Sequence, residues 1–152
     1  MDDTETNMED LGNGLPEARA VEPVRILLVD DNDDYRRQAA RYLVEFDCCR
    51  VGGFAASGRE AVLLAKQQRF DLVLMDLAMP EMGGFEATLR IKQQPNAPRV
   101  VIVSLGRGEA YRIASEAAKA DGFLSKADFA NEIGPLLERL FPEQCGREVG
   151  VP

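Results

Sequence analysis

Polar residues that can do chemistry follow four short apolar runs of the chain. They are Asp30 with Asp31, Asp76, Ser104 and Lys126. Short, unbroken apolar runs are typical of strands that are buried on both faces of a parallel sheet. In open parallel sheets, ligands bind beyond the carboxyl ends of the strands. We therefore expect these side chains to meet at one spot that can hold a divalent cation and a phosphoryl group.

The three carboxylates at these strand ends predict a Mg²⁺ site. Asp30, Asp31 and Asp76 would lie at adjacent strand ends, and crowded carboxylates repel one another unless they are protonated or bridged by a cation. Magnesium takes one or two carboxylates, keeps several waters and completes its octahedron with phosphate oxygens. Two acids after a strand are also typical of a solvated turn or a helix N-terminus. The metal prediction therefore depends on the strand ends coming together.

Asp76 is the expected phosphoryl acceptor, because carboxylates are known covalent carriers of phosphoryl groups. Ser104 supplies a hydroxyl that can bond a phosphoryl oxygen, and Lys126 supplies a positive point charge. Taken singly, a serine at a strand end is more typical of a turn, and a lysine there is more typical of a solvated surface. Their joint occurrence at consecutive strand ends favours the functional interpretation.

Strand and helix patterns alternate along the chain. We expect strands at 25–29, 50–54, 71–75, 99–103 and 122–125. We expect helices at 33–46, 58–68, 84–94 and 108–119, and a final helix that bears Ile133, Leu136, Leu137 and Leu140. Five strands alternating with five helices predict an α/β fold, a flavodoxin-like doubly wound five-stranded parallel sheet in the order 2-1-3-4-5.

Local patterns refine the expected helices. Ser57 and Glu60 have the spacing of a capping box at a helix start. Gly134 and Pro135 should break or restart the last helix, because proline lacks an amide hydrogen and clashes with the preceding turn. Two apolar stripes should face the core: Tyr35, Ala39, Leu43 and Phe46 in the first helix, and Ala110, Ile113, Ala114, Ala117 and Ala118 in the fourth.

The composition narrows the class of protein. The chain has 152 residues, 45% of them hydrophobic, and a net charge of −8, which suits one globular domain with a core. No apolar stretch approaches the roughly 18–20 residues that span a bilayer, and the acidic N-terminus lacks the pattern of a secretory signal. Residues 23–152 carry 17 basic and 19 acidic side chains, so the chain lacks the excess of basic side chains that binds the phosphate backbone of a nucleic acid. We predict a cytoplasmic protein without membrane or nucleic-acid partners.

The chain ends and the cysteines complete the expected organisation. We predict a disordered acidic tail at 1–22, with an interaction tail as the alternative, a folded domain at 23–141 and a flexible tail at 142–152. Cys48, Cys49 and Cys145 are odd in number and lack metal-ligand spacing, so we expect reduced thiols. The chain has no histidine, which excludes histidine-based catalytic triads and means that a phosphoryl group must come from another molecule.

The folded region resembles the receiver domain of bacterial two-component response regulators. The matching segments are ILLVDDN (26–32), LVLMDLAMPEMGGFE (72–86), VVIVS (100–104) and GFLSKAD (122–128). The resemblance implies phosphoryl transfer onto Asp76 from a sensor histidine kinase or a histidine phosphotransfer protein. It implies that Mg²⁺ is held by Asp30 or Asp31, by Asp76 and by the backbone carbonyl of Ala78. Ser104 and Lys126 would bind the phosphoryl group, and Ser104 with Phe123, the rotating aromatic residue, would form the switch.

These 152 residues leave no room for an output domain beside the expected receiver, so we predict a stand-alone receiver that is not an enzyme. Phosphorylation of Asp76 would change the surface that binds an unknown downstream protein, and a homodimer formed on phosphorylation is left open. One departure from the family concerns Ala127, where many members have proline, so the usual cis peptide need not form.

Three other functions compete with this prediction. A Mg²⁺-dependent phosphatase with an aspartyl nucleophile usually needs a second acid two residues after the nucleophile, where this chain has Ala78, although Asp31 and Asp33 do have that spacing. Flavin binding on the same fold would place a phosphate beside the acidic run 30–34, which would repel it. A receiver-like interaction module that is never phosphorylated is the third alternative.

Overall fold

The computed structural model describes residues 21–106 and 108–146. Its strands are β1 (Val24–Val29), β2 (Cys49–Ala55), β3 (Leu72–Asp76), β4 (Arg99–Ser104) and β5 (Gly122–Ser125). Its helices are α2 (Asp33–Leu43), α3 (Gly58–Gln67), α4 (Gly84–Lys92), α5 (Glu109–Ala117), α6 (Phe129–Leu140) and α7 (Pro142–Cys145), with a 3₁₀ turn, η2 (Lys126–Asp128), before α6. The acidic tail predicted at 1–22 lies outside the described residues except for its last two.

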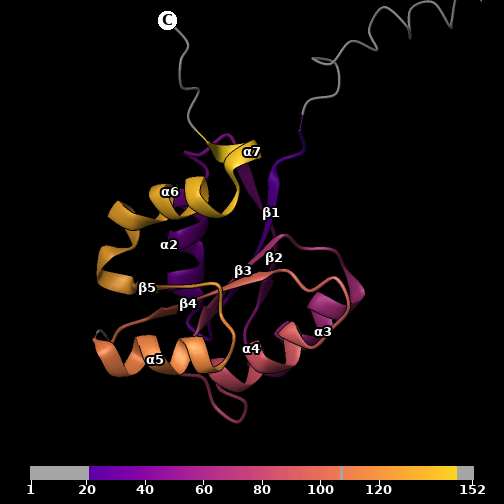
Figure 1. Cartoon of the computed structure of the whole chain (residues 1–152), viewed down its shortest axis with the longest axis vertical. Coiled ribbons are helices and arrows are strands. Elements are labelled where there is room, and N and C mark those ends of the chain that lie inside the picture. Colours follow the sequence, from indigo (N-terminus) through magenta and orange to yellow (C-terminus); the bar gives the residue numbers. More distant parts are fainter. Residues whose placement is uncertain (1–20, 107, 147–152) are drawn as a thin grey trace, which may run out of the picture.

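The five strands form one parallel sheet in the order β2-β1-β3-β4-β5, which confirms the predicted fold class (Figure 1). In the register of the sheet, Asp76 lies opposite Val103 and Ser104 lies opposite Ser125. The carboxyl ends of β3, β4 and β5 are therefore level with one another. This alignment places the side chains that follow these strands at one edge of the sheet.

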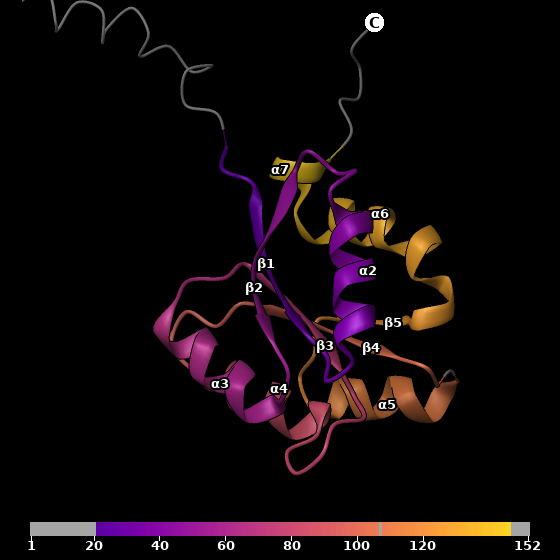
Figure 2. The ribbon, with the colours of Figure 1, turned by 180° about the vertical axis from the view of Figure 1, so that it is seen from behind.

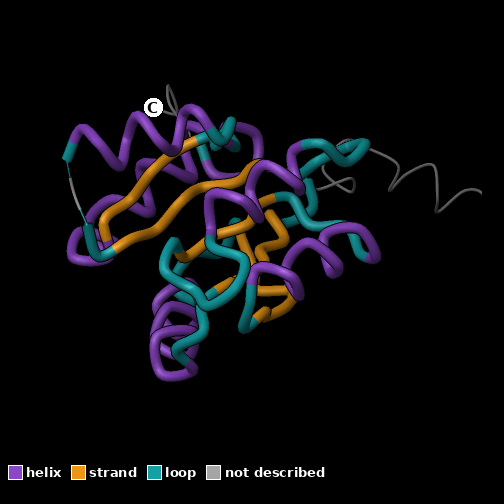
Figure 3. The backbone as a smooth tube through the Cα atoms, turned by 90° about the horizontal axis from the view of Figure 1, so that it is seen from below, coloured by secondary structure: helices purple, strands orange, loops and turns teal. Residues whose placement is uncertain are grey.

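Helices cover both faces of the sheet, as the alternation of strands and helices predicts. Helices lie on both sides of the strands (Figure 3), with α2 and α6 on one face and α3 and α4 on the other (Figure 2). Along β1 the buried side chains alternate between the two cores, with Ile26 and Leu28 on one side and Leu27 and Val29 on the other. Burying each such side chain contributes about 1.5–3 kcal/mol, so the central strands are fixed from both sides.

The helix starts follow the predicted capping. The amide of Glu60 donates to the hydroxyl of Ser57 at 3.1 Å, and the carboxylate of Glu60 accepts from the amide of Ala56 at 2.9 Å. The prediction of a break at Gly134 and Pro135 is wrong, because α6 runs through both residues. Pro135 and Asn131, four residues before it, are both exposed, so water can satisfy the carbonyl that proline leaves without a donor.

The apolar stripe predicted for the fourth helix is also wrong in part. Ser115 and Ala118 are buried, whereas Ile113 is 56% exposed and Ala110 and Ala117 face solvent. The hydroxyl of Ser115 donates to the backbone carbonyl of Tyr111 at 2.8 Å, so this polar side chain can be buried with its hydrogen bond made.

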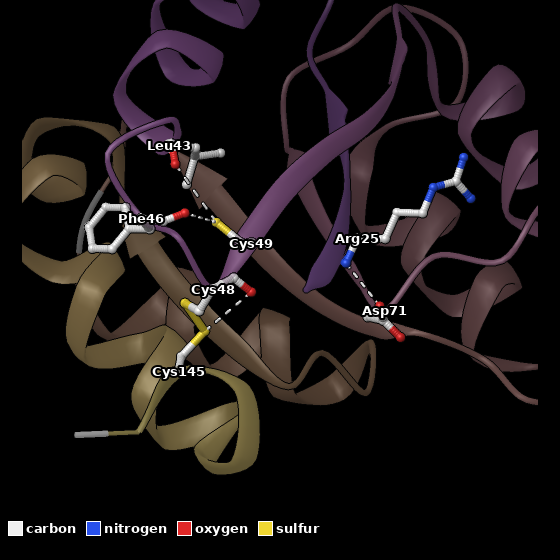
Figure 4. Close-up of a disulfide and its surroundings, with 7 residues drawn as sticks. All are labelled: Arg25, Leu43, Phe46, Cys48, Cys49, Asp71 and Cys145. Atoms are coloured by element: carbon white, nitrogen blue, oxygen red, sulfur yellow. Dashed lines mark hydrogen bonds between the residues drawn. A yellow bond between two sulfur atoms is a disulfide. The ribbon is translucent and has the colours of Figure 1, made fainter. Parts of the chain in front are cut away.

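The prediction of three reduced cysteines is wrong for two of them. Cys48 and Cys145 form a disulfide whose Cα atoms lie 5.2 Å apart, and Cys49 is a buried free thiol (Figure 4). Part of the predicted C-terminal tail is therefore ordered as α7, which lies at the end of the molecule where β1 begins (Figure 1). The two bonded residues are 97 positions apart, and only the turn from α6 into α7 brings them together.

Within the described residues, no helix has the length and apolar character needed to cross a bilayer. The described residues contain no cis peptide bond, so the bond between Lys126 and Ala127 is trans.

Candidate functional site

The loop from β1 into α2 fixes the first two acids. Asp30 is buried, and its amide donates to the carbonyl of Ala55 at 3.1 Å. Its carboxylate accepts from the amide of Asn32 at 2.9 Å, and the side chain of Asn32 caps α2 by accepting from the amide of Tyr35 at 3.0 Å. Asp31 is exposed. One acid is thus held inside the sheet edge, and its neighbour faces solvent.

The backbone around Asp76 is fixed by the start of α4. The amide of Gly84 donates to the carbonyl of Leu77 at 3.0 Å. A Cβ atom on Gly84 would lie 2.1 Å from the carbonyl oxygen of Asp76, so no side chain fits at this position. The close approach of α4 to the end of β3 holds the buried Asp76 carboxylate in place.

The structure brings four of the predicted residues into contact range. One carboxylate oxygen from each of Asp30, Asp31 and Asp76 lies within 4.8 Å of the others. The ammonium of Lys126, which follows β5, lies 2.6 Å from Asp30 Oδ2 and 3.3 Å from Asp76 Oδ1. The two buried acids, Asp30 and Asp76, therefore share a single lysine, and the exposed Asp31 lies beside them.

Charge and burial shift the acidities of this cluster. Burial, with the charge of Asp30 added to it, raises the pKa of Asp76 to about 6, although Lys126 opposes the shift. Burial alone would lower the pKa of Lys126, but its hydrogen bond to Asp30 and the charge of Asp76 raise it above the ordinary value. At neutral pH the acid at the end of β3 is largely ionised and the lysine is charged.

The remaining predicted residues lie on the neighbouring strands and in the loop after β3, at different depths. Ser104 is buried at the end of β4, the strand next to β3, and its hydroxyl accepts from the amide of Gly106 at 3.0 Å. Phe123 is half-buried on β5, where its ring stacks on that of Tyr111 with the centroids 6.4 Å apart. Ala78 is exposed in the loop after β3, so only its backbone can serve as a ligand.

Two residues that the sequence analysis did not assign to the site lie against it. The ammonium of Lys126 lies 4.2 Å from the centre of the Tyr35 ring. The largely buried guanidinium of Arg36 donates to the backbone carbonyl of Asp30 and forms an ion pair with Asp33 at 2.8 Å. The stripe pattern placed Tyr35 in the core, and no spacing in the sequence indicates its contact with Lys126.

The three acids fit a Mg²⁺ ion. Mg²⁺ binds oxygen at about 2.0–2.1 Å, so two ligands on opposite sides of the ion are about 4.2 Å apart. The separations of up to 4.8 Å in the cluster are close to that span. The exposure of Asp31 leaves a side on which the water ligands that Mg²⁺ prefers can enter.

Comparisons with known proteins place the fold and its chemistry in context. A family model described as the response regulator receiver domain matches residues 26–135. The response regulator GacA of Pseudomonas protegens is 34% identical over 121 residues, which are 80% of this chain and 57% of that protein. This chain therefore spans little more than half of the length of that relative.

Solved structures agree with the family match. A two-component response regulator of the LuxR family from Aurantimonas sp. SI85-9A1 superposes with a TM-score of 0.75 at 31% identity, covering 82% of this chain and 89% of that one. A DNA-binding response regulator of the LuxR family from Staphylococcus aureus superposes with a TM-score of 0.70. Its identity of 17%, over 77% of this chain and 98% of that one, shows the fold alone.

Proposed function

This chain belongs to the response regulator receiver domain family, and from that membership we propose that it accepts a phosphoryl group on Asp76. As a receiver domain, it takes part in two-component signalling. One observation carries the proposal: the buried Asp76 carboxylate lies 3.3 Å from the Lys126 ammonium and beside two further acids. A nucleophilic carboxylate, a fixed positive charge and an acidic pair are the groups that phosphoryl transfer to an aspartate requires.

The transfer step uses the ionised form of Asp76. A carboxylate oxygen attacks the phosphorus of a phosphohistidine, so that an O–P bond forms and the P–N bond breaks. The leaving imidazole nitrogen keeps the electron pair and takes a proton from water. The pKa of about 6 leaves most of the Asp76 carboxylate ionised at neutral pH, as this attack requires.

Asp30, Asp31 and Asp76 would hold Mg²⁺ through their carboxylates, and Ala78 would hold it through its backbone carbonyl. The bound ion would neutralise charge on the phosphoryl oxygens during transfer. Lys126 supplies a second positive charge beside Asp76, since its ammonium lies within 3.3 Å of the Asp76 carboxylate and 2.6 Å of the Asp30 carboxylate.

A switch would follow from the new charge. A phosphoryl group adds about −1.5 to −2 charges and several acceptor oxygens. The hydroxyl of Ser104 now accepts from the amide of Gly106, and turning it toward a phosphoryl oxygen would shift the loop between β4 and α5. Phe123 on β5 packs beside that loop through Tyr111 and would change its position with it. Near-complete switching from a 1:99 ratio requires about 5.5 kcal/mol of differential stabilisation.

The phosphatase alternative finds less support in the arrangement of the acids. Ala78 has no carboxyl group two residues after Asp76. Asp33, which has the required spacing from Asp31, is exposed on α2 and pairs with Arg36 and Arg37. Asp33 is not among the clustered acids, so it does not lie beside Asp31 in position to protonate a leaving group. We therefore propose that the chain is not an enzyme.

The partners we propose follow the chemistry of the family. A sensor histidine kinase or a histidine phosphotransfer protein would supply the phosphoryl group, and a downstream protein, or a second copy of this chain, would bind the switched surface. We keep the cytoplasm as the proposed location. We do not retain the expectation of a stand-alone receiver without a nucleic-acid partner, because this chain spans 57% of the length of GacA and the Staphylococcus aureus neighbour is described as a DNA-binding response regulator.

Labelling with radioactive acetyl phosphate tests the proposal. In the presence of Mg²⁺, the protein should take up label as an acyl phosphate that hydroxylamine removes, and the Asp76→Asn variant should take up none. Asp47→Asn is the matched control, since Asp47 is exposed in the turn before β2. Label that persists in Asp76→Asn would overturn the assignment, and an unlabelled wild-type protein would support the interaction module. Turnover of a phosphomonoester would support the phosphatase.

A further inference from the structure

The aromatic ring of Tyr35 lies against Lys126, the lysine of the candidate site. The ammonium of Lys126 lies over the ring, 4.2 Å from its centre. The phenol oxygen is buried and has no hydrogen-bond partner within the described residues. The contact between Tyr35 and Lys126 is therefore made by the face of the ring and not by the hydroxyl.

The Tyr35 ring also packs against the first residue of α6. Its edge packs against Phe129, with the ring centroids 6.4 Å apart and the planes at 77°. The space left between the ring, Phe129 and the carboxylates of Asp30 and Asp76 amounts to about 10 Å³, too little for a ligand. Because η2 joins Lys126 to Phe129, the Tyr35 ring contacts both ends of the same short turn.

The ring differs from the other two partners of Lys126 in one respect. Asp30 and Asp76 are carboxylates, and a cation bound between them would compete with the lysine for their oxygens. The face of an aromatic ring attracts an ammonium group but is a poor ligand for a hard divalent cation. Of the contacts that the Lys126 ammonium makes with Asp30, Asp76 and the Tyr35 ring, the ring contact is therefore the one that cation binding leaves in place.

We infer that Tyr35 is a positioning residue, whose ring keeps the Lys126 ammonium beside Asp76 when a cation engages the acidic cluster. This inference rests on the proposed function of Asp76. Lysine has a flexible four-carbon stem, and a fixed ring face restricts the directions in which the ammonium can turn. Replacing the ring should leave Lys126 free to turn away from the phosphoryl site.

The metal-free protein provides the first test, by NMR. Protons above an aromatic face shift upfield, so the ε-methylene protons of Lys126 should resonate upfield of those of exposed lysines. The shift should persist in Tyr35→Phe and disappear in Tyr35→Leu. Tyr42→Leu is the matched control, because Tyr42 also packs on Phe129, with the ring centroids 6.1 Å apart, and its hydroxyl donates to the carbonyl of Ala130. A wild-type protein without the upfield shift would overturn the inference, whether or not the variants fold.

Affinity for beryllium fluoride with Mg²⁺ provides the second test. A cation–π contact of this kind corresponds to about a 2- to 30-fold change in affinity. Tyr35→Leu should bind more weakly by that factor, and Tyr35→Phe should recover the wild-type value. Equal affinity in Tyr35→Leu and in the wild type would defeat the inference while leaving Asp76 as acceptor. A wild-type protein that takes up no label from acetyl phosphate would instead defeat the proposed function. The NMR shift would still test the contact between the Tyr35 ring and Lys126.

Discussion

The ammonium of Lys126 lies closer to Asp30, at 2.6 Å, than to Asp76, at 3.3 Å. The lysine therefore makes its shorter contact with an acid of the proposed metal site and its longer one with the proposed acceptor. A cation bound by Asp30 would weaken the shorter contact, and a phosphoryl group on Asp76 would strengthen the longer one. Metal binding and phosphorylation would thus move the same lysine in the same direction.

The ionised Asp76 should reduce the stability of the metal-free protein at neutral pH. Its pKa is raised from 3.8 to about 6 in the folded state, so the folded protein binds this proton more tightly than the unfolded chain does. The resulting loss of stability is absent below about pH 4, grows as the pH rises to about 6, and is complete above that. Asp76→Asn should therefore raise the free energy of unfolding at pH 7 by about 3 kcal/mol.

Urea unfolding in EDTA at pH 7 and at pH 4 measures this effect. The difference between Asp76→Asn and the wild type should shrink at pH 4, where the Asp76 carboxyl is already protonated in the folded state. An Asn variant whose advantage is the same at both values of pH would contradict the assignment of the raised pKa to Asp76.

Magnesium should stabilise the fold through the acidic cluster. A ligand that binds only the native state at ten times its Kd adds about 1.4 kcal/mol to the free energy of unfolding. Thermal unfolding should therefore shift upward with millimolar MgCl₂ and return when EDTA removes the ion. Asp31→Asn should reduce the shift, because Asp31 supplies one of the clustered oxygens. Asp34→Asn, at an exposed acid on the same helix start, should retain it.

The strands and their order could be predicted because their residues are buried on both faces and leave long apolar runs. The meeting of Asp30, Asp76 and Lys126 followed from the same argument, since parallel strands bring their carboxyl ends to one edge. These features depend on local composition and on a general rule of topology. Neither requires knowledge of a specific contact between side chains.

The features that the sequence did not reveal depend on contacts between distant parts of the chain. The bond from Cys48 to Cys145 needs the turn after α6, and the ring of Tyr35 meets Lys126 only because α2 packs beside the start of α6. α6 continues through Pro135 because the affected carbonyl lies on the exposed side of the helix. A period of apolar residues does not show which side of a short helix will be covered, as the burial of Ser115 demonstrates.

Removing the hydroxyl of Tyr35 should make the protein more stable. The oxygen is buried without a hydrogen-bond partner in the described part of the chain, so folding strips it of water without replacing the lost bond. Tyr35→Phe should raise the free energy of unfolding by about 1 kcal/mol, as measured by urea titration. Tyr42→Phe provides the contrast, since the Tyr42 hydroxyl donates to the carbonyl of Ala130 at 2.7 Å and its loss should destabilise. Equal losses of stability in the two variants would contradict this prediction, because they would indicate that the Tyr35 hydroxyl also has a hydrogen-bond partner.

Reduction of the Cys48–Cys145 bond should lower stability, because the bond restricts the unfolded chain over a separation of 97 residues. The expected loss in the free energy of unfolding is about 2–4 kcal/mol, measured with and without a dithiol reductant. Cys145→Ser should abolish the dependence on reductant, whereas Cys49→Ala should retain it, since Cys49 is a free thiol. Equal stability with and without reductant would show that the bond does not hold α7 against the start of β2.

The free thiol should resist alkylation. Burial raises the pKa of Cys49 to about 11, so iodoacetamide at pH 7.5 should modify the reduced native protein at Cys48 and Cys145 and spare Cys49.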